Sequence, residues 1–214
     1  MKKNKNAVLI LLNYGIVVAL LLMIAIFSFT SKNFFRTSTM FTILKQVSIT
    51  GIVCIGQTMV MLTGGIDLSV GSVAGVSAVT AAIFLKSYNL PIPVTCILVL
   101  ILSLIYGLIS GFLAGIAGLV LLSRTSSGQP SAGSGYEMDA ITAVVLGGVS
   151  LNGGEGKLHM VVIGMLIMGV LTTGMIMCGI NDYVQQFVKG IVLILAVAYS
   201  EISKKIRSRM IVTE

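Results

Sequence analysis

The sequence predicts an all-α protein, a polytopic transmembrane helix bundle of about six spans plus a re-entrant half-span. Hydrophobic residues make up 56% of the 214 residues and charged residues only 10%, whereas a soluble domain carries about 25% charged residues. The alternating ten-residue segments that are typical of a membrane β-barrel are absent. Glycine is abundant, at 24 residues, as in helices that pack closely within lipid. We therefore expect residues 1–214 to form a single transmembrane domain.

The first half of the chain contains three apolar runs of membrane-spanning character. Ala7–Phe29 has 23 residues, enough to cross a hydrocarbon core of about 30 Å. The connection Thr30–Gln46 carries three basic residues and is predicted to lie outside the cell. Two spans follow, Val47–Leu62, with a start expected a few residues earlier at Ile43, and Val70–Leu85, and a break on the inner side separates them. The prolines of Lys86–Pro93 then mark an outer turn.

The next segment, Ile92–Leu122, has an anomalous length. Its 31 residues carry no charge and would extend about 46 Å as one helix, which exceeds the thickness of a bilayer core. The segment is nevertheless too short for two crossings of roughly 20 residues each and a turn. Tilt, emergence into the cytoplasm, or a kink at Gly107, Gly111 or Gly115 would absorb the surplus. These three glycines recur every fourth residue and predict a close-packing helix face.

The second half of the chain is predicted to contain a half-span and two full spans. The stretch Arg124–Asp139 is rich in turn-forming residues and is predicted to be an inner connection. Ala140–Leu151 is too short to cross the bilayer and is interpreted as the re-entrant element. After the glycine-rich turn Asn152–Gly156, the spans Leu158–Ile180 and Tyr183–Ser200 complete an even number of crossings.

The net charge of +7 is distributed as in a membrane protein rather than a nucleic-acid-binding protein. Basic clusters precede the first apolar run and follow the last one, which predicts that both termini are cytoplasmic. The C-terminal cluster also suits contact with anionic lipid head groups. The basic residues assigned to the inside are Lys2, Lys3, Lys5, Arg124, Lys157, Lys204, Lys205, Arg207 and Arg209.

The break Leu62–Ser72 places the carboxylate of Asp67 between two spans. Irregular backbone survives at membrane depth only where protein or an aqueous cavity surrounds it, and an ionisable group there is a candidate functional residue. Two interpretations remain open, and they are compatible. Asp67 caps the following helix by accepting N–H bonds of the Leu68–Ser69–Val70 turn, or it contacts a transported solute.

A second glycine-rich segment resembles the first. Gly64–Gly71 and Gly147–Gly154 share three glycines and a leucine in register, and paired interrupted segments are typical of a transport pathway at a repeat interface. Glu137 and Asp139, at the start of the half-span, suit either the positive end of the helix dipole or a role in gating or ATPase contact. The candidate pathway or gating residues are Gly64, Gly65, Asp67, Ser69, Gly71, Glu137, Asp139, Gly147, Gly148 and Asn152.

Enzymatic and metal-dependent functions are not expected. His159 is the only histidine, and no serine–aspartate or cysteine partner is placed beside it in the sequence. Cys54, Cys96 and Cys178 have no paired spacing, so neither a disulfide framework nor a metal site is predicted, and no cofactor is implied. A channel or secondary carrier is disfavoured because the sequence indicates no buried charge pair for ion coupling.

Two stretches resemble the signature regions of ribose-type ABC importer permeases, namely Thr63–Ser72 and Ser126–Gly156. The resemblance extends from Phe34 to Tyr199. It implies a multi-pass permease in the bacterial inner membrane for a monosaccharide or similar small polar solute. It further implies a second permease subunit, identical or different, an ABC ATPase subunit that hydrolyses ATP inside, and an extracytoplasmic sugar-binding protein that delivers the solute.

The chain departs from this family at its centre. Such permeases carry further helices between the segments that correspond here to Gly111 and Phe112, and a cytoplasmic loop that docks on the ATPase. Neither is present, so a junction is expected near residues 111–112, in agreement with the anomalous length of Ile92–Leu122. The alternative function is therefore a truncated, transport-incompetent membrane protein that associates with a full-length permease.

Overall fold

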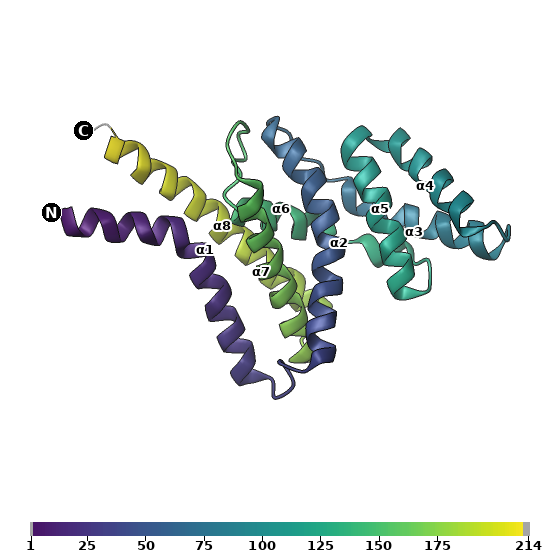
Figure 1. The fold of residues 1–214 in the computed structure, drawn as a ribbon, viewed down its shortest axis with the longest axis horizontal. Coiled ribbons are helices and arrows are strands. Elements are labelled where there is room, and N and C mark those ends of the chain that lie inside the picture. Colours follow the sequence, from purple (N-terminus) through teal and green to yellow (C-terminus); the bar gives the residue numbers. More distant parts are fainter. Residues whose placement is uncertain (1, 212–214) are drawn as a thin grey trace.

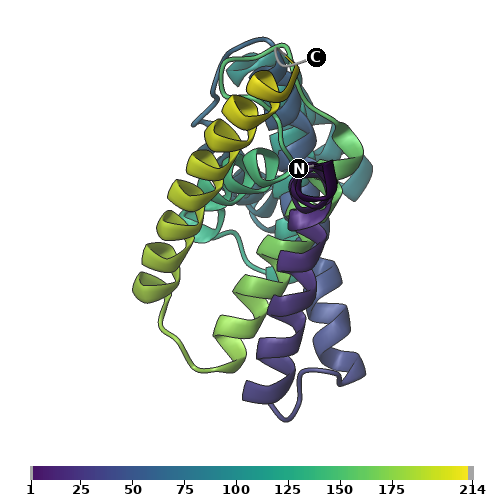
Figure 2. The same ribbon diagram turned by 90° about the vertical axis from the view of Figure 1, so that its left-hand side faces the viewer.

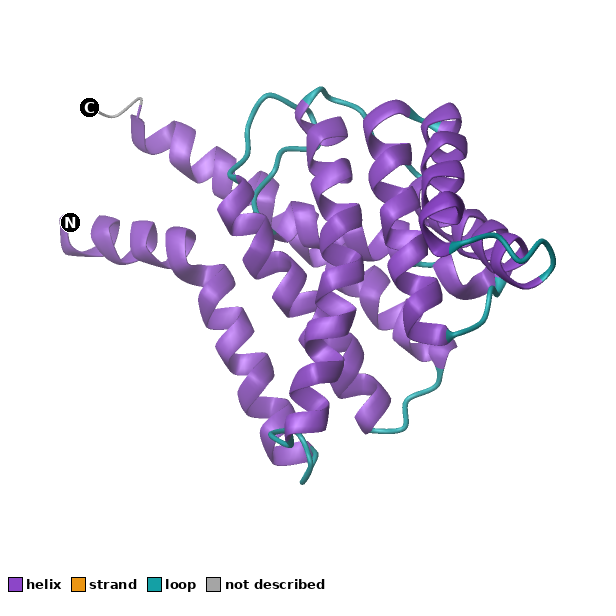
Figure 3. Ribbon diagram, turned by 45° about the vertical axis from the view of Figure 1, so that its right-hand side comes forward, coloured by secondary structure: helices purple, strands orange, loops and turns teal. Residues whose placement is uncertain are grey.

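A computed structural model describes the backbone of residues 2–211 and the side chains of residues 15–107, 109–129, 131–203 and 205. Over this part of the chain the fold is entirely helical, with eight α-helices, one short 3-10 helix and no strand (Figures 1 and 3). The elements are α1 (Lys2–Thr30), α2 (Thr37–Leu62), α3 (Val70–Lys86), α4 (Ile92–Tyr106), α5 (Leu108–Thr125), η1 (Pro130–Gly133), α6 (Tyr136–Leu146), α7 (Leu158–Met177) and α8 (Asp182–Ile211). The all-α prediction is confirmed.

The helices form two groups that share α2. On one side, α7 packs against α1, α2 and α6, and α6 also contacts α2 and α8. On the other side, α3, α4 and α5 pack together, and α5 joins them to α2 (Figure 1). One apolar core runs through both groups. Its most buried members include Ile49, Val53, Ala74, Ala117, Ala140, Val144, Val161 and Met168.

The outside of the bundle is apolar, as expected of a protein solvated by lipid. Among the residues whose side chains are described, three helical stretches are long and apolar enough to cross a membrane: α2, α7 and Asp182–Ser203 of α8. Shorter apolar helical stretches cover Gly15–Thr30, Val70–Lys86, Ile92–Tyr106 and Ile109–Thr125. Large apolar side chains exposed on α1, α4 and α8 include Leu21, Ile26, Ile101, Ile105, Ile194 and Leu195.

Helix α2 begins earlier than the sequence predicted. Its first residue is Thr37, so the connection expected over Thr30–Gln46 is reduced to a short turn. The hydroxyl of Thr39 donates to the Asn33 carbonyl at 2.9 Å and ties this turn to the helix. Thr39 and Gln46 are both buried. Polar residues that suggested a loop therefore lie in a helix, and neighbouring elements cover two of them.

The prediction of one span over Ile92–Leu122 is wrong. The segment forms two helices, α4 and α5, which meet at Gly107 and pack against each other (Figure 1). Gly107, one of the three predicted kink sites, has extended backbone at φ 174°. A Cβ added at Gly115 would lie 2.6 Å from the Ser103 Cβ, and one at Gly111 would collide with the Ser103 carbonyl. The close-packing glycine face is therefore confirmed for Gly111 and Gly115, which close a helical hairpin, whereas Gly107 forms its connection.

The half-span is displaced toward the N-terminus relative to the predicted Ala140–Leu151. Helix α6 starts at Tyr136, and η1 occupies part of the expected loop. The helix ends at Leu146 because Gly148, at φ +78°, turns the chain back. The N–H of Gly148 donates to the Val145 carbonyl at 2.9 Å, and the N–H of Val149 donates to the Val144 carbonyl at 3.2 Å.

Arg124 does not lie at the same end of the bundle as Lys157, contrary to the prediction. Its guanidinium donates to the side-chain oxygen of Gln46 at 2.6 Å. Gln46 is in the first half of α2, whereas Lys157 follows a loop that touches Leu62 at the other end of α2. The connection after α5 therefore approaches the bundle from the side of the α1–α2 turn.

Both chain ends lie at one end of the molecule. Helix α1 starts and α8 finishes on the same side, and the α1–α2 and α7–α8 turns lie at the opposite end (Figures 1 and 2). This arrangement agrees with two termini on the same side of the membrane. The side chains of Lys2, Lys3, Lys5, Lys204, Arg207 and Arg209 lie outside the described residues, and the cytoplasmic orientation stays a prediction.

Candidate functional site

The break between α2 and α3 is held by a buried amide that sequence reasoning missed. Gln57 of α2 has no exposed surface. With its amide oriented to satisfy both groups, the nitrogen donates to the Asp67 backbone carbonyl at 2.9 Å and the oxygen accepts from the Asp67 N–H at 3.3 Å. Two backbone groups of Asp67, which lies outside the helices, are thereby satisfied. The signal available in the sequence was a glutamine within an apolar run, ten residues before Asp67.

The carboxylate of Asp67 is directed into its own turn. Its Oδ1 accepts from the Ser69 N–H at 2.8 Å and from the Ser69 hydroxyl at 2.6 Å. Partial burial works to raise the pKa of Asp67, but hydrogen bonds from Ser110 and Ser69 outweigh it and lower the pKa below its usual value. The carboxylate is therefore charged at neutral pH. It accepts the Ser69 N–H of the predicted turn, but Ser69 is the N-cap residue of α3 and makes no side-chain cap bond, so Asp67 stabilises the turn before α3 and does not bind an N–H of the helix itself.

The two glycine-rich segments meet in space. The N–H of Gly154 donates to the Leu62 carbonyl at 2.9 Å. A Cβ added at Gly153 would lie 2.7 Å from the Gly64 nitrogen, so the two backbones touch without side chains between them. Gly64 and Gly153 have φ near +84° and +80°, a region that glycine adopts without steric cost. Segments far apart in the sequence thus form one paired loop structure at one end of the bundle.

The start of the half-span approaches α3 through another glycine. A Cβ at Gly71 would collide with the Glu137 carboxylate and lie 2.7 Å from the Gly133 carbonyl oxygen. The Oε1 of Glu137 accepts from the Gly135 N–H at 3.2 Å, whereas Oε2 is buried with no donor among the described residues. Glu137 therefore lies at the positive end of α6, as the helix-dipole interpretation expects.

Asp139 forms an ion pair inside the bundle. Its Oδ2 lies 2.8 Å from the Nζ of Lys189 on α8, and the two side chains are 4% and 15% exposed. The expectation that the chain lacks buried charge pairs is therefore wrong. Lys189 escaped sequence reasoning because it sits within the apolar run Tyr183–Ser200, where a single lysine gives no indication of its partner.

The predicted candidates thus divide into two places. Gly64, Asp67 and Ser69 lie in the break between α2 and α3, next to the segment that contains Gly147, Gly148 and Asn152. Glu137 and Asp139 lie in the first turn of α6, where Gly71 of α3 contacts Glu137. Gly65 packs its backbone against Val60, and the Asn152 N–H donates to the Ser150 hydroxyl oxygen at 3.2 Å.

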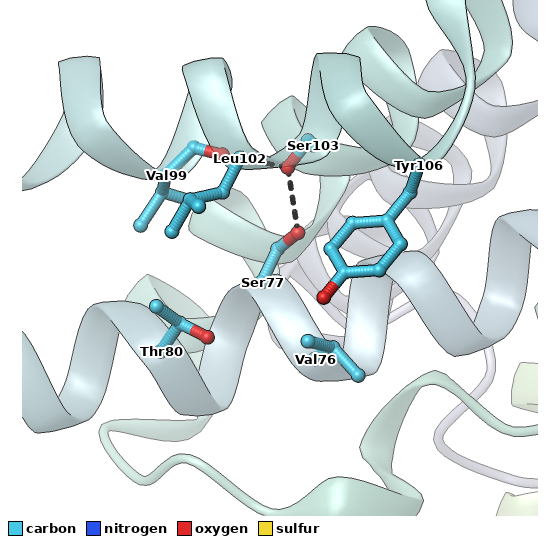
Figure 4. A pocket seen from close by; sticks show the side chains of 7 residues that line it. All are labelled: Val76, Ser77, Thr80, Val99, Leu102, Ser103 and Tyr106. Carbon is cyan, nitrogen blue, oxygen red and sulfur yellow. Dashed lines mark hydrogen bonds between the residues drawn. The ribbon is translucent and has the colours of Figure 1, made fainter.

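A small hydroxyl-lined pocket lies elsewhere, between α3 and α4 (Figure 4). Its volume of about 40 Å³ suits water and is far below that of a ligand site, which is several hundred Å³. The hydroxyls of Ser77 and Ser103 lie 2.9 Å apart at its wall, and Tyr106 closes one side. No group of three or more metal-ligating side chains occurs in the described part of the chain.

Comparison with known proteins identifies a permease family and several transport relatives. The family model described as branched-chain amino acid transport system, permease component, matches residues 39–109 and 104–197. The ribose import permease protein RbsC of Escherichia coli strain K12 is 30% identical over 291 residues, covering 84% of this chain and 91% of that protein. Its Bacillus subtilis strain 168 counterpart is 28% identical, covering 86% and 91%.

The L-arabinose transport system permease protein AraH of Escherichia coli strain K12 is 40% identical over 117 residues, covering 55% of this chain and 34% of that protein. No solved structure matches the chain. Two features of these matches concern the centre of the chain. The family model matches in two pieces that overlap at residues 104–109, and the alignment with the ribose permease is longer than the 214 residues of this chain.

Proposed function

Because this chain belongs to the branched-chain amino acid transport system permease family, we propose that it is a membrane-spanning subunit of an ABC importer for a monosaccharide or a similar small polar solute. The observation that carries this proposal is the similarity to the ribose import permease across 84% of the chain. The arabinose permease supports the same solute class. All of these relatives are transport subunits, and the chain is a multi-pass inner-membrane protein rather than an enzyme.

The proposed partners follow from the same similarity. An extracytoplasmic sugar-binding protein delivers the solute, a separate ABC ATPase subunit hydrolyses ATP, and a second permease subunit completes the pathway. Both termini face the cytoplasm, and so do the paired loops that contain Gly64 and Gly153. In this orientation Asp67 lies near the inner end of the pathway, where its charge is available to a gating contact.

A second candidate function is a transport-incompetent subunit that binds a full-length permease. The split family match and the long alignment favour it, since both are expected if a central block near residues 111–112 is missing. ATP-driven import needs a contact with the ATPase that differs between two states of the permease. The family's docking loop, which makes this contact, is absent from the sequence.

Reconstituted vesicles test both candidates. With the cognate ATPase and binding protein, we expect no uptake of radiolabelled pentose when this chain is the only permease. When a full-length permease of the same system is added, the chain should co-purify with it. Higher uptake than with the full-length permease alone supports a transport subunit, and unchanged uptake supports the second candidate.

Two further outcomes would contradict these proposals. Robust uptake with this chain as the only permease would show that the central block is dispensable. Failure of the chain both to co-purify with the full-length permease and to support uptake would contradict both candidate functions. Insertion of the chain in the vesicles is verified first by its resistance to alkaline extraction, so that failed insertion is not mistaken for either outcome.

A further inference from the structure

We propose that Lys189 is a positioning residue that locks the re-entrant half-span α6 to α8 through its ion pair with Asp139. Their 2.8 Å contact joins a buried carboxylate to a largely buried ammonium group. The inference deepens the proposed function, because α6 leads into the paired glycine loops. Its test below measures the position of α6 and needs no transport.

The geometry of α8 makes this contact unusually important. Only a small part of the apolar stretch Asp182–Ser203 is fully buried, and among the helices α8 packs chiefly against α6. Lys189 lies on the same helical face as Val192 and the buried Ala196, one and two turns further on. The lysine therefore points at the element against which α8 makes most of its helix contacts.

Few other polar interactions hold the first turn of the half-span α6 to its neighbours. Helix α6 has only the residues Tyr136–Leu146, so it cannot reach both faces of a bilayer and depends on its neighbours for its position. Asp139 is in its first turn, and the second carboxylate oxygen, Oδ1, is buried without a donor among the described residues. Loss of Lys189 would leave this carboxylate with no described partner at all, and an uncompensated buried charge is strongly unfavourable.

The same helix transmits its position to the paired loops. Helix α6 ends in the Gly147–Gly148 turn, and the segment that follows donates the Gly154 N–H to the Leu62 carbonyl. A shift of α6 relative to α8 would therefore move the segment that supports the α2–α3 break. The ion pair couples α8, the half-span and these loops into one unit.

A native cysteine reports on the position of α6. The thiol of Cys54 on α2 is fully buried and donates to the Ala140 carbonyl, 3.8 Å away, next to Asp139 in the chain. The chain has three cysteines, so the substitutions Cys96→Ser and Cys178→Ser leave Cys54 as the single thiol. Movement of α6 away from α2 would uncover it.

The experiment measures the rate at which a membrane-permeant maleimide alkylates Cys54 in the purified chain in detergent micelles. Wild-type protein should react slowly. Lys189→Met, which keeps the length of the apolar stem but removes the charge, should raise the rate about tenfold by opening the half-span locally. Lys189→Arg should keep the slow rate, and Lys86→Met, at an exposed lysine that ends α3, should have no effect.

The direction of the change separates movement from electrostatics. If α6 stayed in place, the unpaired Asp139 charge beside Cys54 would disfavour the reactive thiolate and slow alkylation. A faster reaction therefore reports displacement. A rate equal to or below that of the wild type in the folded Lys189→Met variant, or an equal rise in Lys86→Met, would overturn the proposal.

A second variant guards against general misfolding, which far-UV circular dichroism detects. If Lys189→Met does not fold, the pair Asp139→Asn with Lys189→Met replaces it, because no buried charge is then left unpaired. If the ion pair holds α6 in position, Cys54 should still react faster in this double variant than in the wild type. Wild-type protection in this double variant would show that the ion pair balances charge without positioning α6, and the proposal would fail.

Discussion

At the scale of single residues, the α2–α3 break depends on two side chains with different tasks. Gln57 satisfies the backbone N–H and carbonyl of Asp67 from within the core. The Oδ1 of Asp67 in turn accepts hydrogen bonds from the Ser69 N–H and the Ser69 hydroxyl. The amide thus fixes where the break lies relative to α2, and the carboxylate fixes the local conformation of the turn.

Substitution of Asp67 separates its geometry from its charge. Asp67→Asn should change the free energy of unfolding little, because the asparagine oxygen accepts the same Ser69 hydrogen bonds, whereas Asp67→Ala should cost about 0.5–2 kcal/mol. Chemical or detergent unfolding followed by circular dichroism measures both variants. An asparagine variant as unstable as the alanine variant would show that the charge itself supports the fold.

Substitution of Gln57 should have a larger effect. Gln57→Leu leaves the Asp67 N–H and carbonyl without their side-chain partners, at a cost of about 1–3 kcal/mol for each buried group that water does not reach. Gln186→Leu is the matched control, because Gln186 is exposed on α8. The midpoint of thermal unfolding should fall for the first variant and stay near that of the wild type for the second. Equal midpoints would contradict the role assigned to Gln57.

At the scale of elements, glycines determine how closely helices approach. Gly118 faces α3, where an added Cβ would collide with the Ala74 carbonyl and lie 2.7 Å from the Ser77 Cβ. Gly111 and Gly115 face Ser103 of α4 in the same way. Helix α5 therefore presents glycine to two neighbours, and this close packing allows α3, α4 and α5 to form a compact group.

Alanine substitution tests this packing. Gly118→Ala should destabilise the fold by about 1–3 kcal/mol, because the methyl group meets backbone atoms that cannot move without separating α3 from α5. Gly190 of α8 has nothing within 4 Å of an added Cβ. Gly190→Ala should therefore be neutral or stabilising by up to about 1 kcal/mol through helix propensity. The reverse order of stabilities would refute the predicted α3–α5 contact.

At the scale of the whole molecule, the arrangement of the ends makes a topological prediction. Helix α1 begins and α8 ends on the same side of the bundle (Figure 2), and the basic clusters at both ends predict that this side is cytoplasmic. Alkaline phosphatase fused to either terminus should be inactive in bacteria, and a green fluorescent protein fused there should fluoresce. Active phosphatase at either end would contradict the prediction that this terminus is cytoplasmic.

The sequence by itself determined the class, the family resemblance and most helix positions, since apolar length and charge placement are local properties that a bilayer selects directly. Gly64 and Gly148 likewise indicated where helices end, because a residue with positive φ interrupts a helix and glycine adopts this conformation most easily. What sequence reasoning missed are the partners of polar residues. Helix α2 starts at Thr37, and two polar residues near its start, Thr39 and Gln46, are buried by contacts that the local sequence does not indicate.

Only the tertiary structure decided which polar groups meet. Gln57 finds the Asp67 backbone ten residues ahead, and Lys189 finds Asp139 fifty residues away. The 31-residue apolar segment became a hairpin at Gly107 because Gly111 and Gly115 can pack on Ser103. Each of these outcomes depends on burial by another element. Hydropathy predicts that a segment is buried away from water. It does not predict which partner a buried polar group has, because that partner comes from another element, and an unpaired polar group is costly in the low-dielectric interior.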